Sequence, residues 1–181
     1  MRARSLQRRA YVLLALAAAG LAGCGYALVG RGTSLPEDIR TIYVQTLANR
    51  TARAQVDQIL TQAIIDEFVT RRRFEVVRSQ IEADAVMSGT VMAFNTRPVT
   101  FAREGSTSGR ATEYEIIITA NMEFRRTDSG DVLWRQSQYQ FRESYQVDVS
   151  EIEYFDRQDQ ALEEVAGKFA ETLVIDVLEG F

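Results

Sequence analysis

The chain has 181 residues, 46% of them hydrophobic, which suits one domain with a single core. Its formal net charge is −4. The first 23 residues carry four arginines and no acid, so the rest of the chain has a net charge of −8. Such an acidic domain argues against nucleic-acid binding, which needs a basic face. With no histidine and a single cysteine, Cys24, a zinc site and all histidine-based catalysis are excluded, and we expect no enzymatic activity, metal or cofactor.

The N-terminus has the pattern of a bacterial signal peptide. A basic segment, residues 1–9, precedes an apolar run, Ala10–Ala22, that is too short for a permanent membrane-spanning helix of roughly 20 residues. The sequence Leu21-Ala22-Gly23-Cys24 resembles the lipobox of bacterial lipoproteins, which implies cleavage before Cys24 and lipidation of its thiol. The alternative is a buried free cysteine after an ordinary signal peptide. Gly25, rather than aspartate, follows, and by resemblance to lipoprotein sorting this favours the outer membrane.

Residues 24–38 are expected to form a lipidated tether. They contain three glycines and Pro36, with little periodicity. If extended, this segment reaches on the order of 45 Å at ~3.3 Å per residue. We therefore expect a signal peptide over residues 1–23, the tether, and one domain over residues 39–181.

The domain is expected to begin with a strand and a helix. Residues 39–47 (IRTIYVQTL) are rich in β-branched residues and predict a strand. Apolar residues then recur every three or four positions, which predicts a helix over 51–71 with one face on a sheet. Asn49 or Thr51 is the expected cap. We interpret the arginines at 71–73 mainly as the helix end, where their charge opposes the dipole, and otherwise as a ligand patch.

Several strands are expected to follow. Residues 83–94 predict a strand, with a shorter one at 74–77. Residues 95–111, which contain Pro98 and two glycines, are expected to form a long flexible connection.

The clearest strand of the chain covers residues 112–124. Alternate residues from Tyr114 to Phe124 are apolar, and most of those between them are polar. A turn pattern at 127–131 predicts that a strand over 132–145 returns antiparallel to it.

The last element is expected to be a helix over residues 156–178, whose apolar stripe is unbroken. The order strand, helix, several strands, helix predicts an α+β fold. It would be a two-layer sandwich, with two helices packed on one face of a mostly antiparallel mixed sheet of about four strands. The opposite face of the sheet would stay polar and uncovered.

Two surfaces are candidates for binding. Arg97, Arg103 and Arg110 flank the expected flexible connection, and their guanidinium groups could meet an anionic glycolipid, although scattered loop charge also explains them. The uncovered sheet face could dock inside a partner through polar residues, with an aromatic residue at one end. The residues expected there are Gln136, Gln138, Gln140, Arg142 and Trp134.

Two carboxylate pairs are candidates for the catalytic groups of a glycosidase. Glu113 and Glu115 lie on one strand face, and Glu163 and Glu164 lie on the last helix. Each pair sits on the polar side of an amphipathic element, where solvated charge is the default. We therefore predict no catalytic residues.

Several segments of the mature chain, taken in their order along the sequence, resemble the LptE family of lipopolysaccharide-assembly lipoproteins. The resemblance runs through GCGYALVGRGTSLPEDIRTIYVQTLANRT, ADAVMSGTVMAF, ATEYEIIITANMEF, SGDVLWR and ALEEVAGKFAETLVIDVLEGF. It implies an outer-membrane lipoprotein that plugs the lumen of the β-barrel translocon LptD, helps it assemble and contacts lipopolysaccharide during insertion. Cys24 is the one residue for which the resemblance implies a role.

Two other functions remain open. The segment IRTIYVQTLANRT also resembles the start of lipoproteins that regulate peptidoglycan synthesis or form secretion rings. A hydrolase acting through Glu113 and Glu115 is the third possibility. Co-purification with a barrel, a penicillin-binding protein or further copies of the chain would separate the first two.

Overall fold

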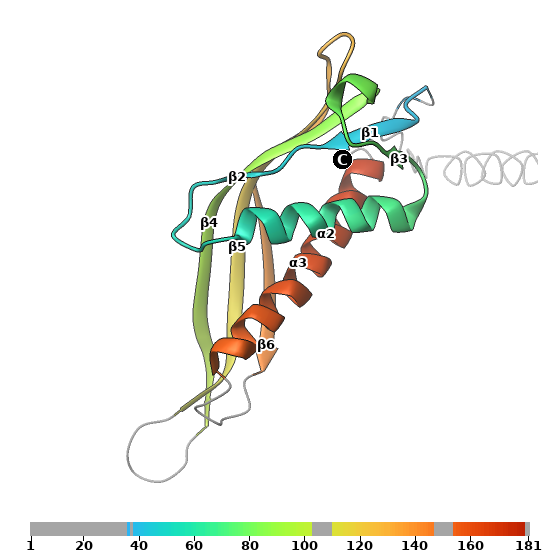
Figure 1. Cartoon of the computed structure of the whole chain (residues 1–181). Helices are drawn as coiled ribbons and strands as arrows, with labels where there is room; N and C mark the ends of the chain where they lie inside the picture. Colours follow the sequence, from blue (N-terminus) through green and yellow to red (C-terminus); the bar gives the residue numbers. More distant parts are fainter. Residues whose placement is uncertain (1–35, 37, 103–109, 147–153, 180–181) are drawn as a thin grey trace, which may run out of the picture. The chain divides into compact units, whose positions relative to one another are not determined.

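The structure is a computed structural model, and it describes residue 36 and residues 38–102, 110–146 and 154–179 (Figure 1). For residues 100–102, 110–112 and 154–160 only the backbone is described. All of these residues belong to a compact unit that covers residues 32–181. The predicted signal peptide, Cys24 and Arg103 lie outside the described residues.

Six strands form one mixed sheet. Three long antiparallel strands, β4 (Ala85–Ala102), β5 (Arg110–Arg126) and β6 (Val132–Gln146), form a ribbon. Three short strands, β1 (Thr41–Val44), β2 (Ala48–Asn49) and β3 (Glu75–Val76), extend the sheet, with β1 and β2 pairing in parallel with the first part of β4. The main order is β3-β1-β4-β5-β6. The α+β prediction is confirmed, although the sheet has two more strands than the expected four.

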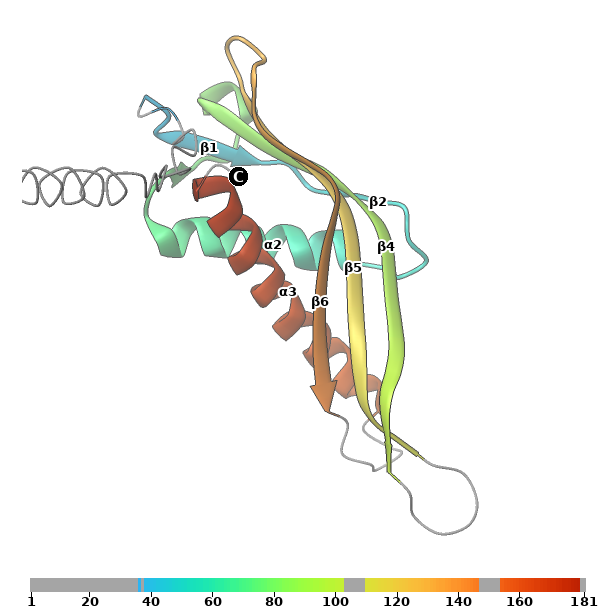
Figure 2. The ribbon, with the colours of Figure 1, turned by 180° about the vertical axis from the view of Figure 1, so that it is seen from behind.

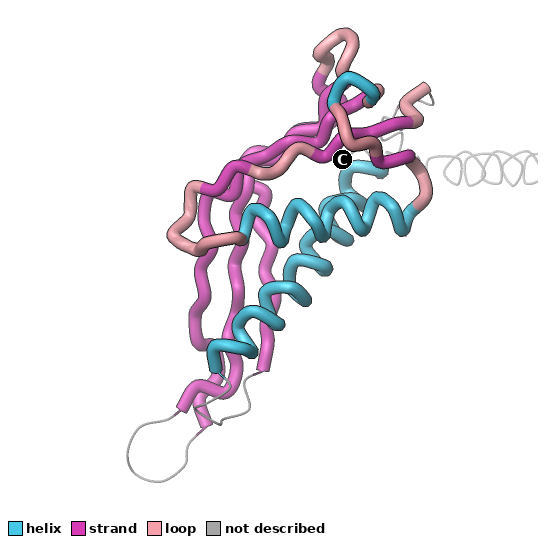
Figure 3. The backbone as a smooth tube through the Cα atoms, in the orientation of Figure 1, coloured by secondary structure: helices cyan, strands magenta, loops and turns pink. Residues whose placement is uncertain are grey.

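Both helices pack on the same face of the sheet. The helices α2 (Val56–Arg71) and α3 (Tyr154–Glu179) contact each other, and both ribbon views place them on one side of the long strands (Figure 2). The tube drawing separates these helical and strand layers by colour (Figure 3). Among the residues that the structure describes, no helix combines the length and apolar character needed to cross a bilayer.

The core lies between this helix pair and the sheet, and it follows the predicted apolar stripes. Helix α3 contributes eight fully buried residues at three- and four-residue steps: Leu162, Val165, Ala166, Phe169, Ala170, Leu173, Val174 and Val177. The alternate residues of β5 from Ile116 to Phe124 meet them from the sheet. The ring of Phe169 packs edge-on against the rings of Tyr139 and Phe141, with centroids 5.7 and 5.9 Å away.

Helix α2 begins later than predicted and without a side-chain cap. Its N-cap is Gln55, in a left-handed conformation with φ 64°, so the expected cap at Asn49 or Thr51 is wrong. Asn49 instead folds the preceding loop, because its Oδ1 accepts from Thr51 N at 2.8 Å and its Nδ2 donates to Arg53 O at 2.8 Å. The helix ends at Arg71, followed by a left-handed Arg72, which confirms the predicted end.

The expected flexible connection over residues 95–111 is wrong for most of its length. Strand β4 continues to Ala102 and β5 starts at Arg110, so the ribbon extends well beyond the short strands. Pro98 does not stop the strand because, in the described residues, β4 beyond Val91 pairs with β5 alone. A strand with one free edge tolerates a residue that lacks an N–H.

Two bulges interrupt the ribbon at the same level. Between the pairs Ala120–Tyr139 and Met122–Gln136, β6 has two residues, including Gln138 with φ 54°, where β5 has only Asn121. Asn121 Oδ1 accepts the Gln138 N–H at 2.9 Å, which stabilises this bulge. Strand β4 carries the other bulge at Met92. Bulges bend strands and increase twist, so both edges of the ribbon bend here.

Candidate functional site

The face of the ribbon opposite the helices is polar and carries most of its charges in pairs. Alternation along β5 places its glutamates on this face, with four arginines on β4, β5 and β6: Glu113, Glu115, Glu123, Arg97, Arg125, Arg135 and Arg142. Arg97 Nε donates to Glu115 Oε2 at 2.7 Å across the β4–β5 pair. Among the described residues, both helices lie on the other side of the sheet, so this face is polar and uncovered there as predicted, and its charges nearly balance.

Glu123 joins two arginines at one end of this face. Arg125 Nε donates to Glu123 Oε1 at 2.7 Å, and Arg135 Nε donates to Oε2 at 2.6 Å. Partial burial alone would raise the pKa of Glu123, but the hydrogen bonds from the two guanidinium groups outweigh it and hold the pKa below its usual range. The carboxylate therefore stays ionised and keeps both arginines engaged.

A surface hollow of about 470 Å³ runs across the strands on this face, beside the triad of Glu123, Arg125 and Arg135 and at the level of the bulges. Polar side chains from the β1–β2 segment and all three long strands line most of it: Gln45, Thr46, Ser88, Thr90, Asn121, Glu123, Arg135, Gln136 and Ser137, with Ala48, Gly89 and Met122. Sequence reasoning missed this hollow. The only available signal was Gly89 inside an otherwise regular strand, which often marks a close backbone approach.

The bulge in β6 changes which of the expected residues share the uncovered face. Gln140 and Arg142 lie on it, and Arg142 Nη2 donates to Gln140 Oε1 at 2.6 Å. Gln138 lies in the bulge itself, and Gln136 pairs with the buried Met122. Trp134 is 5% exposed and belongs to the core, so its placement at the end of the polar face is wrong. No turn residue in the sequence marks this bulge.

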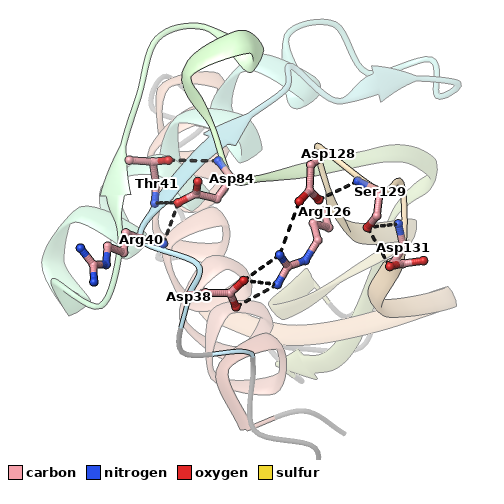
Figure 4. A network of polar contacts seen from close by, with 8 residues as sticks. All are labelled: Asp38, Arg40, Thr41, Asp84, Arg126, Asp128, Ser129 and Asp131. Carbon is pink, nitrogen blue, oxygen red and sulfur yellow. Dashed lines mark hydrogen bonds and ion pairs between the residues drawn. The ribbon is translucent and has the colours of Figure 1, made fainter.

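A polar network ties the start of the domain to the C-terminal end of β5, close to the Glu123 triad (Figure 4). Asp38 forms a bidentate pair with Arg126, with oxygen–nitrogen distances of 2.7 and 2.8 Å. Asp84 Oδ2 accepts the backbone N–H groups of Arg40 and Thr41, both at 2.9 Å. These bonds fix where the preceding segment enters the domain, beside the turn between β5 and β6.

The network also fixes the ionisation of its acids. The two backbone hydrogen bonds lower the pKa of Asp84, and the hydrogen bond from Arg126 lowers the pKa of Asp38. Both carboxylates are therefore charged near neutral pH. Because Asp38 and Arg126 are solvent-accessible, their contribution is mainly to geometry.

The structure does not bring the three predicted lipid-contacting arginines together in a described loop. Arg97 is a strand residue, paired with Glu115, rather than part of a flexible connection. Arg110 begins β5, but its side chain is not described, and Arg103 lies outside the described residues. Whether they contact an anionic lipid stays a prediction.

One glutamate of each candidate carboxylate pair is engaged by a basic side chain. Glu115 is held by Arg97, and Glu164 is paired with Lys168 at 3.0 Å. Lys168 also binds Glu143 at 2.6 Å, which joins α3 to β6. In the described ranges, no group of three potential metal-ligating side chains occurs.

Comparison with known proteins finds one family and several related folds. A family model described as LptE, lipopolysaccharide-assembly, matches residues 39–177. No curated protein matches the chain.

Three solved structures share the fold at 11–14% sequence identity, a level at which the likeness concerns the fold alone. Lipoprotein B from Nitrosomonas europaea is 13% identical, with 85% of this chain and 90% of that chain covered and a TM-score of 0.50. A PelC dodecamer from Paraburkholderia phytofirmans is 14% identical, with coverages of 81% and 94% and a TM-score of 0.50. A protein from Xanthomonas campestris is 11% identical, with coverages of 81% and 88% and a TM-score of 0.51.

Proposed function

Because the chain belongs to the LptE family of lipopolysaccharide-assembly proteins, we propose that it is an outer-membrane lipoprotein that plugs and helps assemble an LptD-type β-barrel translocon. In this proposal the signal peptide, residues 1–23, is removed, and acylated Cys24 anchors the chain on the periplasmic side. Residues 24–38 form the tether and residues 39–181 the working domain. The domain assists lipopolysaccharide insertion through its surfaces, without catalysis, cofactor or nucleic acid.

The observation that carries this proposal is the uncovered polar face of the ribbon. The interior of an outer-membrane barrel is polar, so a partner inside it needs a polar surface with satisfied charges. The face offers both, because Glu115 and Glu123 are paired with arginines. An apolar face in this position would instead favour a hydrophobic interface.

The point at which the chain joins the domain supports the same arrangement. The Asp38–Arg126 pair places the first described residues at the end of β5 where the β5–β6 turn lies. The other end of β5, a 17-residue strand, lies on the order of 55 Å away at ~3.3 Å per residue. Residues 24–38 join the domain at Asp38, so Arg97 and Arg110 lie towards the end of the ribbon away from this junction. That position suits contact with lipopolysaccharide by Arg97, Arg103 and Arg110.

The test is a detergent pull-down of the tagged full chain with mass spectrometry. We expect a barrel of the LptD type in the eluate and diacylglycerol and fatty-acyl mass on Cys24. Cys24→Ala should lose the acyl mass and membrane retention. Recovery of a penicillin-binding protein would favour the regulator of peptidoglycan synthesis, and a homo-oligomer would favour a ring-forming secretion lipoprotein.

A matched pair of variants tests the sheet face itself. Ile117→Arg adds a charge in the middle of the uncovered face, and Val69→Arg adds the same charge at an exposed position of α2. We expect the first to reduce barrel recovery and the second to leave it unchanged. Equal recovery with both variants would contradict docking through this face.

A further inference from the structure

The hollow on the uncovered face contains hydrogen-bonding groups that the protein itself does not use. Within the described residues, the side chains of Gln45, Thr46, Ser88 and Thr90 make no hydrogen bond or ion pair. Each of these amides and hydroxyls can donate and accept at once. They belong to the β1–β2 segment and to β4, which run side by side along the hollow.

The cations beside the hollow are already engaged. Arg125 and Arg135 both bind Glu123, and Arg125 Nη1 also donates to Gly130 O at 3.0 Å. A phosphate group would have to compete with an ionised carboxylate that sits between the two arginines. A site that selects an isolated phosphate normally presents free guanidinium forks. The lining therefore favours a neutral, multiply hydroxylated ligand.

A peptide strand is a poorer fit for this position. Extended peptides that bind sheets add to a free edge, where backbone N–H and C=O groups are unpaired. The hollow instead lies across β4, β5 and β6, and the backbone pairing of Ser88 with Glu123 and of Thr90 with Asn121 runs through it. Only side chains are available there, on neighbouring strands ~4.8 Å apart.

We propose that this hollow is a saccharide-binding site that holds a sugar chain through the amide and hydroxyl side chains of Gln45, Ser88 and Thr90. The inference rests on the proposed function for the source of the sugar, which would be the saccharide part of lipopolysaccharide. It places sugar recognition at the bulges, near the end of the domain where the chain enters. The predicted arginine contacts lie towards the other end of the ribbon.

The experiment is an NMR titration of the full chain in detergent with three separate probes. The first is the core oligosaccharide released from lipopolysaccharide by mild acid and then dephosphorylated. The second is a disaccharide fragment of peptidoglycan, and the third is inorganic phosphate. We expect saturable shifts with the core oligosaccharide for the backbone amides of Ser88, Thr90 and residues 135–137, and none with phosphate.

Matched variants connect these shifts to the hollow. Thr90→Val with Gln45→Ala removes two hydrogen-bonding groups from it, and should weaken oligosaccharide binding about tenfold, or about 1.4 kcal/mol. Thr70→Val with Gln58→Ala makes the same changes on exposed positions of α2 and should leave binding unchanged. Both variants are first checked for an unchanged amide spectrum away from the substitutions.

The outcomes separate this inference from the proposed function. Binding of the peptidoglycan disaccharide alone would support a saccharide site while counting against a role in lipopolysaccharide assembly. Shifts located elsewhere, equal affinities of the two double variants, or a response to phosphate alone would overturn the site. The pull-down with the barrel would stand in those cases, because it does not depend on the hollow.

Discussion

Substituting Gly89 by alanine should destabilise the domain, because there is no room for a Cβ atom at this position of β4. An ideal Cβ would lie 2.5 Å from Met122 Sδ, 2.7 Å from the backbone oxygen of Asn121 and 3.1 Å from Leu47 Cδ2. The methionine can rotate away, but the carbonyl belongs to the neighbouring strand and can move only if the β4–β5 pairing shifts. Overpacking of this kind typically costs about 1–3 kcal/mol.

Part of that cost is offset in the unfolded chain. Alanine reduces the freedom of the unfolded backbone, which is worth about 0.4–1 kcal/mol. The net loss should then be roughly 1–2 kcal/mol, and the melting temperature should fall by about 2–8 °C for a domain of this size. Gly167→Ala is the matched control, because it lies in α3 with nothing within 4 Å. Helix propensity should make it more stable by about 1 kcal/mol.

The assay is thermal and urea denaturation of both variants, followed by circular dichroism under identical conditions. The two substitutions should move the midpoint in opposite directions. If Gly89→Ala proved as stable as the parent chain, the close approach of β4 and β5 at the hollow would be refuted. If Gly167→Ala were also destabilising, the exposure of that helix face would be wrong.

Substitutions at three further positions test the packing and the polar contacts. Phe169→Ala should cost about 3–5 kcal/mol in urea denaturation, because the ring is fully buried against Tyr139 and Phe141, whereas Phe169→Leu should cost less. Tyr139→Phe should lower the free energy of unfolding by about 1 kcal/mol, because it removes the 2.9 Å hydrogen bond from the tyrosine hydroxyl to Asp176. In the parent chain, burial raises the pKa of Tyr139, so this phenol should resist deprotonation in an alkaline titration followed by absorbance. The pKa of Asp84 is lower in the folded state than in the unfolded chain, so its contribution to the free energy of unfolding is fully present above the unfolded-state pKa and is lost as the pH falls through the folded-state pKa. Asp84→Asn should therefore reduce the loss of stability at acidic pH, measured by denaturation curves at a series of pH values. An unchanged acid limb, or no difference between the two Phe169 variants, would contradict these assignments.

The sequence was most informative where the apolar pattern spans a whole element. In α3 every third or fourth residue is apolar, and in β5 every second residue is apolar. The buried residues of both elements follow these patterns. Hydrophobic burial therefore determines these elements by itself. The pattern was weaker in α2, where Asn49 and Thr51 looked like caps but their side chains satisfy a preceding loop instead.

Two features could not be predicted, because they depend on the partner strand. Residues 95–102 include Asn95 and Pro98, which are typical of loops, and precede a Gly- and Ser-rich segment, yet they pair with the strongly patterned β5. Pairing with the partner strand outweighs these local loop signals. The β6 bulge depends on the side chain of Asn121 in another strand, so the sequence around Gln138 does not reveal it. Once the bulge shifted the alternation, Trp134 moved from the expected polar face into the core. The hollow escaped prediction for the same reason.

The irregularities at the two edges of the ribbon determine how the chain can behave beside other β-structure. Within the described residues, one edge is β6, broken by the Ser137–Gln138 bulge, and the other is the second half of β4, which carries Pro98 and further register shifts. Another β-strand would therefore find no long, straight row of free backbone donors and acceptors to pair with at these edges. In the proposed complex, the domain can therefore lie against the wall of the barrel without pairing with it as an additional strand. The same irregular edges disfavour edge-to-edge aggregation of neighbouring copies.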